Sequence, residues 1–304
     1  MIKKIIDPIL PYHKRRHYKK LFLSNLSLGS VRSNWKLSNK FHRTILQRMS
    51  LFLFVTRLER KAKFTDLQTR VVEEKFLNFK ICAYDYFTLN LLIKEIFFSH
   101  EYYFETNVDH PMIIDCGANI GISVLYFKMM FPHSKILAFE PNPHAYQLLK
   151  RNININKLEN VEIKNVALYD EEKEISFFIS NLGAPNASVR KDRGGERELI
   201  VKTQKLSSYL QNVEIIDLIK IDVEGAESNI IDDLVKTSTL NKAKTYLIEY
   251  HHNINQDRSK LSVFLKKFES HGFSYNLRTN YIPGKRFQDI FIHFYRESFD
   301  NSSI

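Results

Sequence analysis

From residue 111 onward, short apolar runs alternate with segments in which apolar residues recur at helical spacing. The runs with the length of buried strands are 112–115, 135–140, 161–168, 216–222 and 244–250. The segments with helical spacing are 120–131, 142–155, 225–236 and 261–268. Two further runs, at 273–277 and 289–295, also have strand character. Strands that alternate with helices predict a mostly parallel sheet with helices on both faces.

Two parts of the chain depart from this alternation. The runs at 174–180 and 198–203 flank a polar loop and predict an extra hairpin. Residues 1–75 show little clean periodicity, so we predict that they form a basic, partly helical N-terminal extension. The remaining residues, 76–304, are predicted to form one Rossmann-like α/β domain whose core covers 111–278.

The positive charge of the chain is concentrated in its first part. The whole chain has a net charge of +11, with 45 Lys and Arg against 34 Asp and Glu. Residues 1–63 hold 16 of the basic residues but only Asp7 and Glu59 as acidic ones, so the rest of the chain is slightly acidic. A polyanionic partner or an anionic membrane surface would suit the extension, and a solvated basic face is the plainer interpretation.

Within this extension we predict a helix over 43–64. Its apolar block, residues 49–56, is far shorter than the roughly 20 apolar residues of a membrane-spanning helix. The apolar start of the chain is too short for a signal peptide, so we expect residence in the cytoplasm. Two alternatives remain for the block Leu51–Val55. Either it lies on the inner face of an anionic membrane with Phe52 or Phe54 inserted, or its aromatic residues pack onto the main domain.

The turn after the first predicted strand of the core reads DCGANIG, from Asp115 to Gly121. Gly117 and Gly121 allow the backbone to turn sharply and to lie close to a ligand. A dinucleotide site needs a G-x-G-x-x-G turn, because its pyrophosphate approaches the glycines and a helix N-terminus. Asn119 stands at the position of the middle glycine, which suits a ligand with no phosphate at this turn.

Residues that suit the ribose and base of a nucleoside follow at the next two strand ends. Glu140 ends the second strand, 19 residues after Gly121. A carboxylate there can accept hydrogen bonds from both ribose hydroxyls, and it repels a phosphorylated ribose. Asn165 and Val166 lie near the end of the third strand, where we expect them to contact an adenine edge. The plainer interpretation of this segment is an ordinary buried strand end.

Carboxylates and histidines gather where the fourth and fifth strands end, in the segments IDVEGAE and IEYHH. The residues concerned are Asp222, Glu224, Glu227, Glu249, His251 and His252. Adjacent residues of a strand point to opposite faces, so we expect one of the two histidines to face the site.

Taken in order, these segments resemble the FkbM-type methyltransferases: DCGANIG, FEPNP, NVAL, the extra hairpin, LIKIDVEGAE and IEYH. The resemblance covers roughly residues 76–278. It implies a class I methyltransferase fold with an antiparallel C-terminal strand, S-adenosylmethionine as cofactor, and methylation of a hydroxyl on a sugar, glycan or related natural product. The residues that match the cofactor motif are Asp115, Gly117, Asn119, Gly121 and Glu140. The residues that match the strand-four motif are Asp222, Glu224, Gly225 and Glu227.

An alcohol becomes a good methyl acceptor only as its proton is removed, so a general base is worth about 10²–10⁴-fold in rate. Asp222 has the better position for this catalytic role, and His251 has the better unperturbed pKa. Glu224 and Glu249 are candidates for acceptor binding. No metal is expected, although a divalent cation held by Asp222, Glu224 and Glu249 is an alternative.

The loop 181–196 is predicted to close over the acceptor, with Arg190 as a candidate contact to an anionic glycan. A mobile surface loop is the plainer interpretation. The strand-four segment holds neither the Asn-Pro-Pro-aromatic turn of nucleobase-amine methylation nor the Pro-Cys of cytosine-carbon methylation, and no DNA partner is expected. Two other functions stay open: a non-catalytic cofactor-binding scaffold in glycan biosynthesis, and an RNA methyltransferase suggested by the basic extension. Docking on a membrane would suit a lipid-linked glycan as acceptor.

Overall fold

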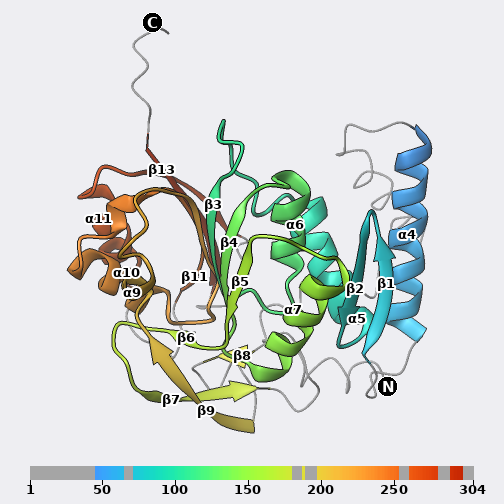
Figure 1. Cartoon of the computed structure of the whole chain (residues 1–304), viewed down its shortest axis with the longest axis horizontal. Helices are drawn as coiled ribbons and strands as arrows, with labels where there is room; N and C mark the ends of the chain where they lie inside the picture. The colour runs from blue at the N-terminus through green and yellow to red at the C-terminus, as the bar shows by residue number, and fades with distance from the viewer. Residues whose placement is uncertain are drawn as a thin grey trace, which may run out of the picture.

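A seven-stranded sheet forms the centre of the protein (Figure 1). The computed structural model describes residues 45–64, 71–179, 187–188, 197–252, 260–279 and 288–296. The strands, in their order across the sheet, are β12 (Ser274–Thr279), β13 (Gln288–Tyr295), β11 (Ala243–His252), β10 (Ile216–Ile221), β3 (Met112–Cys116), β4 (Lys135–Phe139) and β5 (Val161–Lys164). Strand β13 pairs antiparallel with both of its neighbours, whereas the pairs from β11 to β5 are all parallel. The predicted Rossmann-like fold with an antiparallel C-terminal strand is confirmed.

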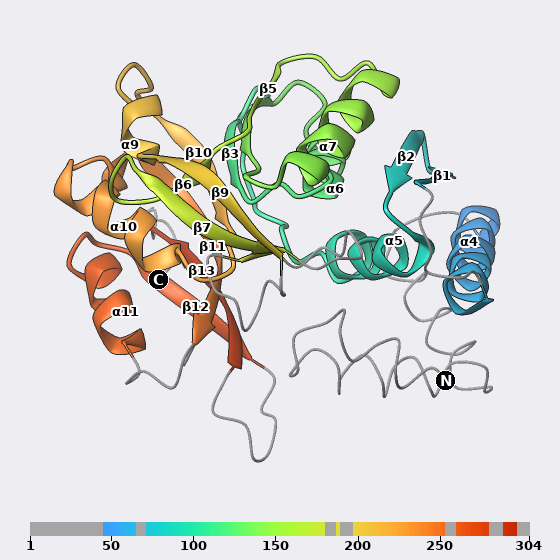
Figure 2. The ribbon, with the colours of Figure 1, turned by 90° about the horizontal axis from the view of Figure 1, so that it is seen from below.

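Helices cover the two faces of this sheet (Figure 2). On one face lie α6 (Ile122–Met130) and α7 (Pro143–Ile155), and on the other lie α9 (Leu206–Tyr209), α10 (Glu227–Lys236) and α11 (Leu261–Glu269). The turn η2 (Leu240–Lys242) leads into β11. Successive side chains of β3 enter opposite cores, because Ile113 packs with the first helix pair and Ile114 with the other helices. A sheet buried on both faces explains why its strands read as continuous apolar runs.

A second, smaller sheet lies beside the carboxyl ends of the central strands (Figure 1). Its strands, in order, are β6 (Ala167–Leu168), β9 (Arg197–Gln204), β7 (Glu174–Ile179) and β8 (Ala187–Ser188). Strands β7 and β9 pair antiparallel, which confirms the extra hairpin. The prediction of one strand over 161–168 is wrong, because the chain leaves the central sheet after Lys164 and joins the second sheet at Ala167.

The N-terminal part contains α4 (Ile45–Phe64), the hairpin of β1 (Val72–Phe76) and β2 (Phe79–Ala83), helix α5 (Tyr86–Leu92) and a π-helical turn, η1 (Ile93–Phe98). The predicted helix is confirmed. It buries Leu51, Val55 and Leu58 in the same core as α6 and α7, and it exposes Met49 and Leu53. None of the described helices is long and apolar enough to cross a membrane.

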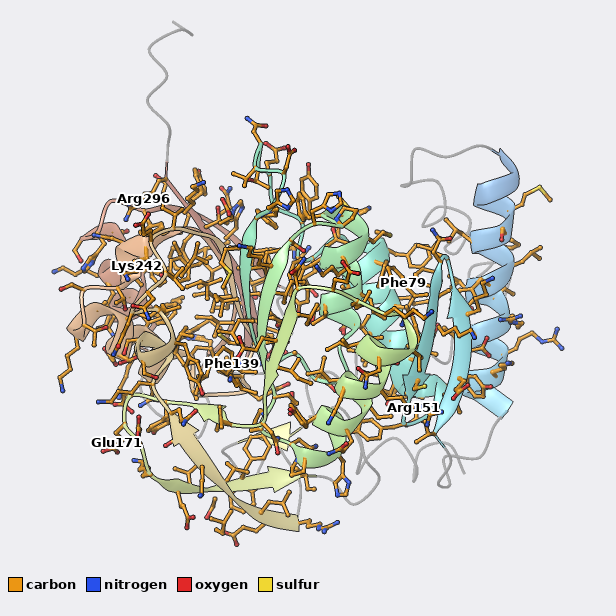
Figure 3. All side chains as sticks on the ribbon, in the orientation of Figure 1. Phe79, Phe139, Arg151, Glu171, Lys242 and Arg296 are labelled. Atoms are coloured by element: carbon orange, nitrogen blue, oxygen red, sulfur yellow. The ribbon has the colours of Figure 1, made fainter. Side chains whose placement is uncertain are left out.

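The β1–β2 hairpin joins this N-terminal part to the central domain. The side chain of Asn152, on α7, accepts from Cys82 N at 2.7 Å and donates to Cys82 O at 2.9 Å. Arg151 points toward the same hairpin (Figure 3), where it pairs with Glu73. The predicted boundary at residue 75 falls inside strand β1, and the division into extension and domain stays a prediction.

Candidate active site

A pocket opens at the carboxyl ends of the central strands. It encloses about 890 Å³, counting the part that is open to solvent, a size typical of small-molecule sites. Its walls come from the turn after β3, the ends of β4 and β10, the β5–β6 junction, strand β7 and the region of α5 and η1. Ligands of parallel sheets bind at this edge, so the pocket lies where the strand pattern predicts a site.

The turn after β3 depends on two glycines. Gly117 has a φ of +87° and Gly121 a φ of +88°, in the left-handed region that favours glycine. A Cβ on Gly117 would lie 1.9 Å from the backbone oxygen of Asp222, and one on Gly121 would lie 2.7 Å from Leu149 Cδ1. Gly117 lines the pocket and Gly121 does not. These glycines are therefore needed for close packing of the turn within the protein, a reason that the motif alone does not reveal.

Asp115 lies behind this turn and outside the pocket lining. It is fully buried and accepts a hydrogen bond from Ser123 Oγ at 2.5 Å. Its Oδ1 atom lies 3.2 Å from Lys220 Nζ. Asp115 is predicted to bind the cofactor, but its contacts hold the turn in place. Asp115 can therefore affect a ligand only by positioning the turn.

Glu140 follows β4 and lines the pocket. Its Oε2 atom accepts from Asn119 N at 2.8 Å, and its Oε1 atom accepts from Asn142 N at 2.8 Å. Burial raises the pKa of Glu140 to about 7, although the two backbone donors and Lys220 limit the rise. The structure thus brings Asn119 and Glu140 together, and the charge of this carboxyl depends on pH near neutrality.

The start of α7 explains the FEPNP motif. The Asn142 side chain caps this helix by accepting from His144 N at 3.0 Å, and Pro143 occupies its first turn. The same residue turns its backbone N–H toward Glu140. A helix-start signal in the sequence therefore also places a donor on the pocket carboxylate.

The two residues predicted for the base subsite lie in different positions. Val166 lines the pocket together with the residues of β6. Asn165 is exposed and does not line it. The Asn165 amide donates to the backbone oxygens of Glu140 at 2.8 Å and Pro141 at 3.1 Å, so its side chain holds the strand end that carries Glu140.

Asp222 follows β10 and lines the pocket at the other end of the turn. Tyr102 Oη donates to Asp222 Oδ2 at 3.2 Å. Lys220 Nζ lies 3.9 Å from the same oxygen. Both contacts engage Oδ2, and no hydrogen bond or ion pair within the described part of the chain engages Oδ1.

Tyr102 and Lys220 are not among the predicted site residues, although both line the pocket. Lys220 is 2% exposed and donates to Gly117 O at 2.7 Å, and its ammonium lies 5.2 Å from the centre of the Tyr102 ring. Burial opposes its charge, but Asp115 and Asp222 outweigh burial and raise the pKa of Lys220. A lysine within an apolar strand could have been recognised from the sequence as a candidate site residue, because a buried lysine needs partners that balance its charge. No local pattern marks Tyr102.

His251 is buried beside the pocket and is not part of its wall. Its Nδ1 atom lies 2.6 Å from Glu227 Oε1, and its Nε2 atom lies 3.3 Å from Glu224 Oε2. Glu224 lines the pocket, so His251 reaches the pocket through Glu224. His252 points the other way, toward the ring of Tyr250, as the alternation along a strand predicts.

The groups around His251 have the spacing of a cation site. Ligand atoms of Asp222, Glu224 and His251 lie within 4.8 Å of one another, and so do those of Glu249, His251 and Asp289. Carboxylate and imidazole ligands suit divalent cations such as Mn²⁺. The alternative of a bound cation therefore stays open, with His251 and Asp289 added to the candidate ligands.

Arg190 lies outside the described residues, as does all of the loop 181–196 except residues 187–188. Its predicted contact with the acceptor, and closure of this loop, stay predictions.

Comparisons with known proteins agree with the motifs. The model of the methyltransferase FkbM domain matches residues 115–275, about half of the chain. Methyltransferase sdnD of Sordaria araneosa is 32% identical over 172 residues, which cover 46% of this chain and 66% of that protein. The 2-O-methyltransferase NoeI of Sinorhizobium fredii is 29% identical over 157 residues, covering 46% of this chain and 63% of that protein. The chain thus spans slightly less than two thirds of these curated relatives.

Among solved structures, the crystal structure of methyltransferase FkbM from Methylobacillus flagellatus is similar at a TM-score of 0.45 and 14% identity. That similarity covers 87% of this chain and 58% of the other.

Proposed function

This chain belongs to the FkbM methyltransferase domain family, and we propose that it transfers a methyl group from S-adenosylmethionine to a hydroxyl of a sugar, glycan or related natural product. Membership confirms the methyltransferase class predicted from the sequence and supports S-adenosylmethionine as the cofactor. One observation supports the transfer itself. The same pocket is lined by Glu140, suited to a ribose, and by Asp222, whose Oδ1 atom makes no hydrogen bond or ion pair with the residues that the structure describes.

The residues of the pocket fit this cofactor. Glu140 can accept from both ribose hydroxyls, because each of its oxygens keeps lone pairs beyond the backbone bond that it accepts. Gly117 lets the turn pass close to the ligand, and Val166 contributes an apolar wall for the base. The turn lacks the glycine pattern of a pyrophosphate site, which agrees with a ligand that has no phosphate there.

When bound, S-adenosylmethionine supplies a methyl group on a positively charged sulfur, which is already activated toward displacement. The protein has to align the acceptor oxygen, which can lower the barrier by about 7–11 kcal/mol, and to manage one proton. Asp222 Oδ1 would take the proton of the acceptor hydroxyl as its oxygen receives the methyl group, and the neutral thioether of the demethylated cofactor would be the leaving group. Tyr102 and Lys220 hold the other oxygen of this carboxylate and fix its orientation.

His251 is better suited to a positioning role than to direct proton removal. Its ring is enclosed between Glu224 and Glu227, and Glu224 stands between it and the pocket. Replacing His251 by Ala should therefore lower turnover by disturbing Glu224, while the cofactor affinity stays close to that of the wild type. Equal turnover of the variant and the wild type would show that His251 has no role in the reaction.

The test of this function is transfer of an isotope-labelled methyl group from S-adenosylmethionine into fractionated glycans, lipids and RNA. We expect label in a glycan or glycolipid fraction with the wild type, and loss of most of it with Asp222→Asn. The exposed Asp232, on α10, provides the matched control, because Asp232→Asn changes a carboxylate outside the pocket. Inclusion of a chelator tests the cation alternative, since only a required metal makes transfer sensitive to it.

The alternatives give different results in the same experiment. Cofactor binding without transfer into any fraction would favour the scaffold. Label in RNA, together with strongly salt-dependent RNA binding, would favour the RNA methyltransferase. Label in a membrane-extracted glycolipid would support a lipid-linked acceptor, and with it docking of the basic residues before α4 on an anionic membrane.

A further inference from the structure

The extra hairpin is built onto the strand that ends at the base side of the pocket. After β5 the chain leaves the central sheet, and β6 pairs with β9, at Ala167 and Thr203 among others. Strand β7 in turn pairs over its full length with residues 197–202 of β9. Figure 1 shows the resulting sheet at the end of the molecule where β5 passes into β6. The hairpin is therefore joined to the β5–β6 junction by backbone pairing.

One hairpin side chain reaches into the pocket. Ile175, Phe177 and Ile179 lie on the same face of β7, since they alternate along the strand. All three belong to a small apolar cluster with Ala167 of β6. Among the described residues of β7 and β9, only Phe177 lines the pocket. Phe177 is 3% exposed, so its ring has a fixed environment.

The position of Phe177 along the pocket follows from its neighbours. Ala167 belongs to the same apolar cluster and also lines the pocket, next to Val166 in the chain. This is the side of the β5–β6 junction, beyond Glu140 at the end of β4, and it is remote in strand order from Asp222 at the end of β10. A nucleoside whose ribose lies at Glu140 would have its base on this side.

We infer that the hairpin is part of the cofactor site, and that Phe177 forms an aromatic wall of the subsite for the adenine base. The inference rests on the proposed use of S-adenosylmethionine. An aromatic ring suits a purine because every base presents a flat π-face, and such contacts account for a substantial part of the affinity for a base. The hairpin would thus help to bind the base of the cofactor, a role distinct from the acceptor role predicted for its loop at 181–196.

Calorimetric titration of the full chain tests this role with two probes, S-adenosylhomocysteine and 5′-methylthioadenosine. Phe177→Ala should raise the Kd of both probes by about tenfold, and by the same factor, because both contain adenosine. Phe177→Leu, which keeps an apolar wall without an aromatic face, should give a smaller rise. The matched control is Ile179→Ala, which truncates the same cluster outside the pocket and should leave Kd within about twofold of the wild type.

Thermal melting of the three variants separates a loss of binding from a loss of folding, since Phe177→Ala and Ile179→Ala remove comparable buried side chains. Equal Kd values for Phe177→Ala and Ile179→Ala would overturn the inference and leave the proposed function intact. A rise in Kd for S-adenosylhomocysteine alone would place Phe177 at the amino-acid half of the ligand and would also overturn it. A wild-type chain that binds neither probe would defeat the proposed function and this inference together.

Discussion

Protonation of Glu140 should weaken cofactor binding below about pH 7. The carboxyl is buried in the pocket wall, and its pKa is raised to about 7 because burial disfavours the charged form. Ribose hydroxyls donate hydrogen bonds, which favour the ionised carboxylate, so binding and protonation compete. Affinity should therefore rise as the pH rises through 7 and should level off above it.

The size of this effect follows from the titration. With a pKa of about 7, roughly one tenth of Glu140 is ionised at about pH 6 and roughly nine tenths at about pH 8. If the ionised form binds, the Kd should fall about tenfold between these two pH values, which is equivalent to about 1.4 kcal/mol. Calorimetry with 5′-methylthioadenosine measures this, because that probe lacks the amino-acid half of the cofactor and its charges.

The variant Glu140→Gln should bind the probe more weakly at about pH 8, and its Kd should no longer depend on pH. Its amide offers one acceptor oxygen where the carboxylate offers two, so one of the backbone donors, Asn119 N or Asn142 N, loses its partner. Glu162→Gln, at an exposed carboxylate on β5, is the matched control and should behave as the wild type. A wild-type Kd that changes less than about twofold, or a Glu140→Gln variant that keeps the full pH dependence, would refute the reasoning.

Three further results are expected. Gly117→Ala should lower the free energy of unfolding, measured by urea denaturation, by roughly 2–5 kcal/mol. The new Cβ would collide with the backbone oxygen of Asp222, and residue 117 has a positive φ. Near-wild-type stability would contradict this packing. Tyr102→Phe should lower turnover by about ten- to a hundredfold with unchanged cofactor affinity, since a lost hydrogen bond to a charged group costs about 1.5–3 kcal/mol. Tyr103→Phe, at an exposed neighbour, should leave turnover unchanged. Removing residues 1–44 should abolish salt-sensitive co-sedimentation with anionic vesicles, and a truncated chain that still sediments would argue against membrane docking.

The deletion is limited to residues 1–44 because the helix that follows, α4, is part of the folded core. The apolar block Leu51–Val55 is attractive as a membrane anchor from the sequence alone. Leu51 and Val55 instead pack in the core, and the ring of Phe54 lies 4.8 Å from that of Phe76. Removing all of residues 1–63 should therefore destabilise the fold, and the effect on membranes would be masked.

The local pattern of the sequence determined the elements of the central domain. Runs such as 112–115 and 135–140 became β3 and β4, because a strand buried on both faces needs continuous apolar residues. The positions of Gly117 and Gly121 were also readable, since a sharp turn between a strand and a helix requires positive φ. Glu140 followed from its spacing, because the length of one strand–helix–strand unit sets where the next strand ends.

Tertiary structure alone decided which side chains meet at the site. Tyr102 reaches Asp222 across 120 residues of chain, and Phe177 enters the pocket only because β5 breaks before β6. Likewise, Glu249 and His251 are not in the pocket wall, although their strand ends beside it. Periodicity reports which face of an element is apolar, and it carries no information about which distant element packs there. Contacts between remote segments depend on how the whole chain packs, so the reacting end of the pocket emerged only from the folded structure.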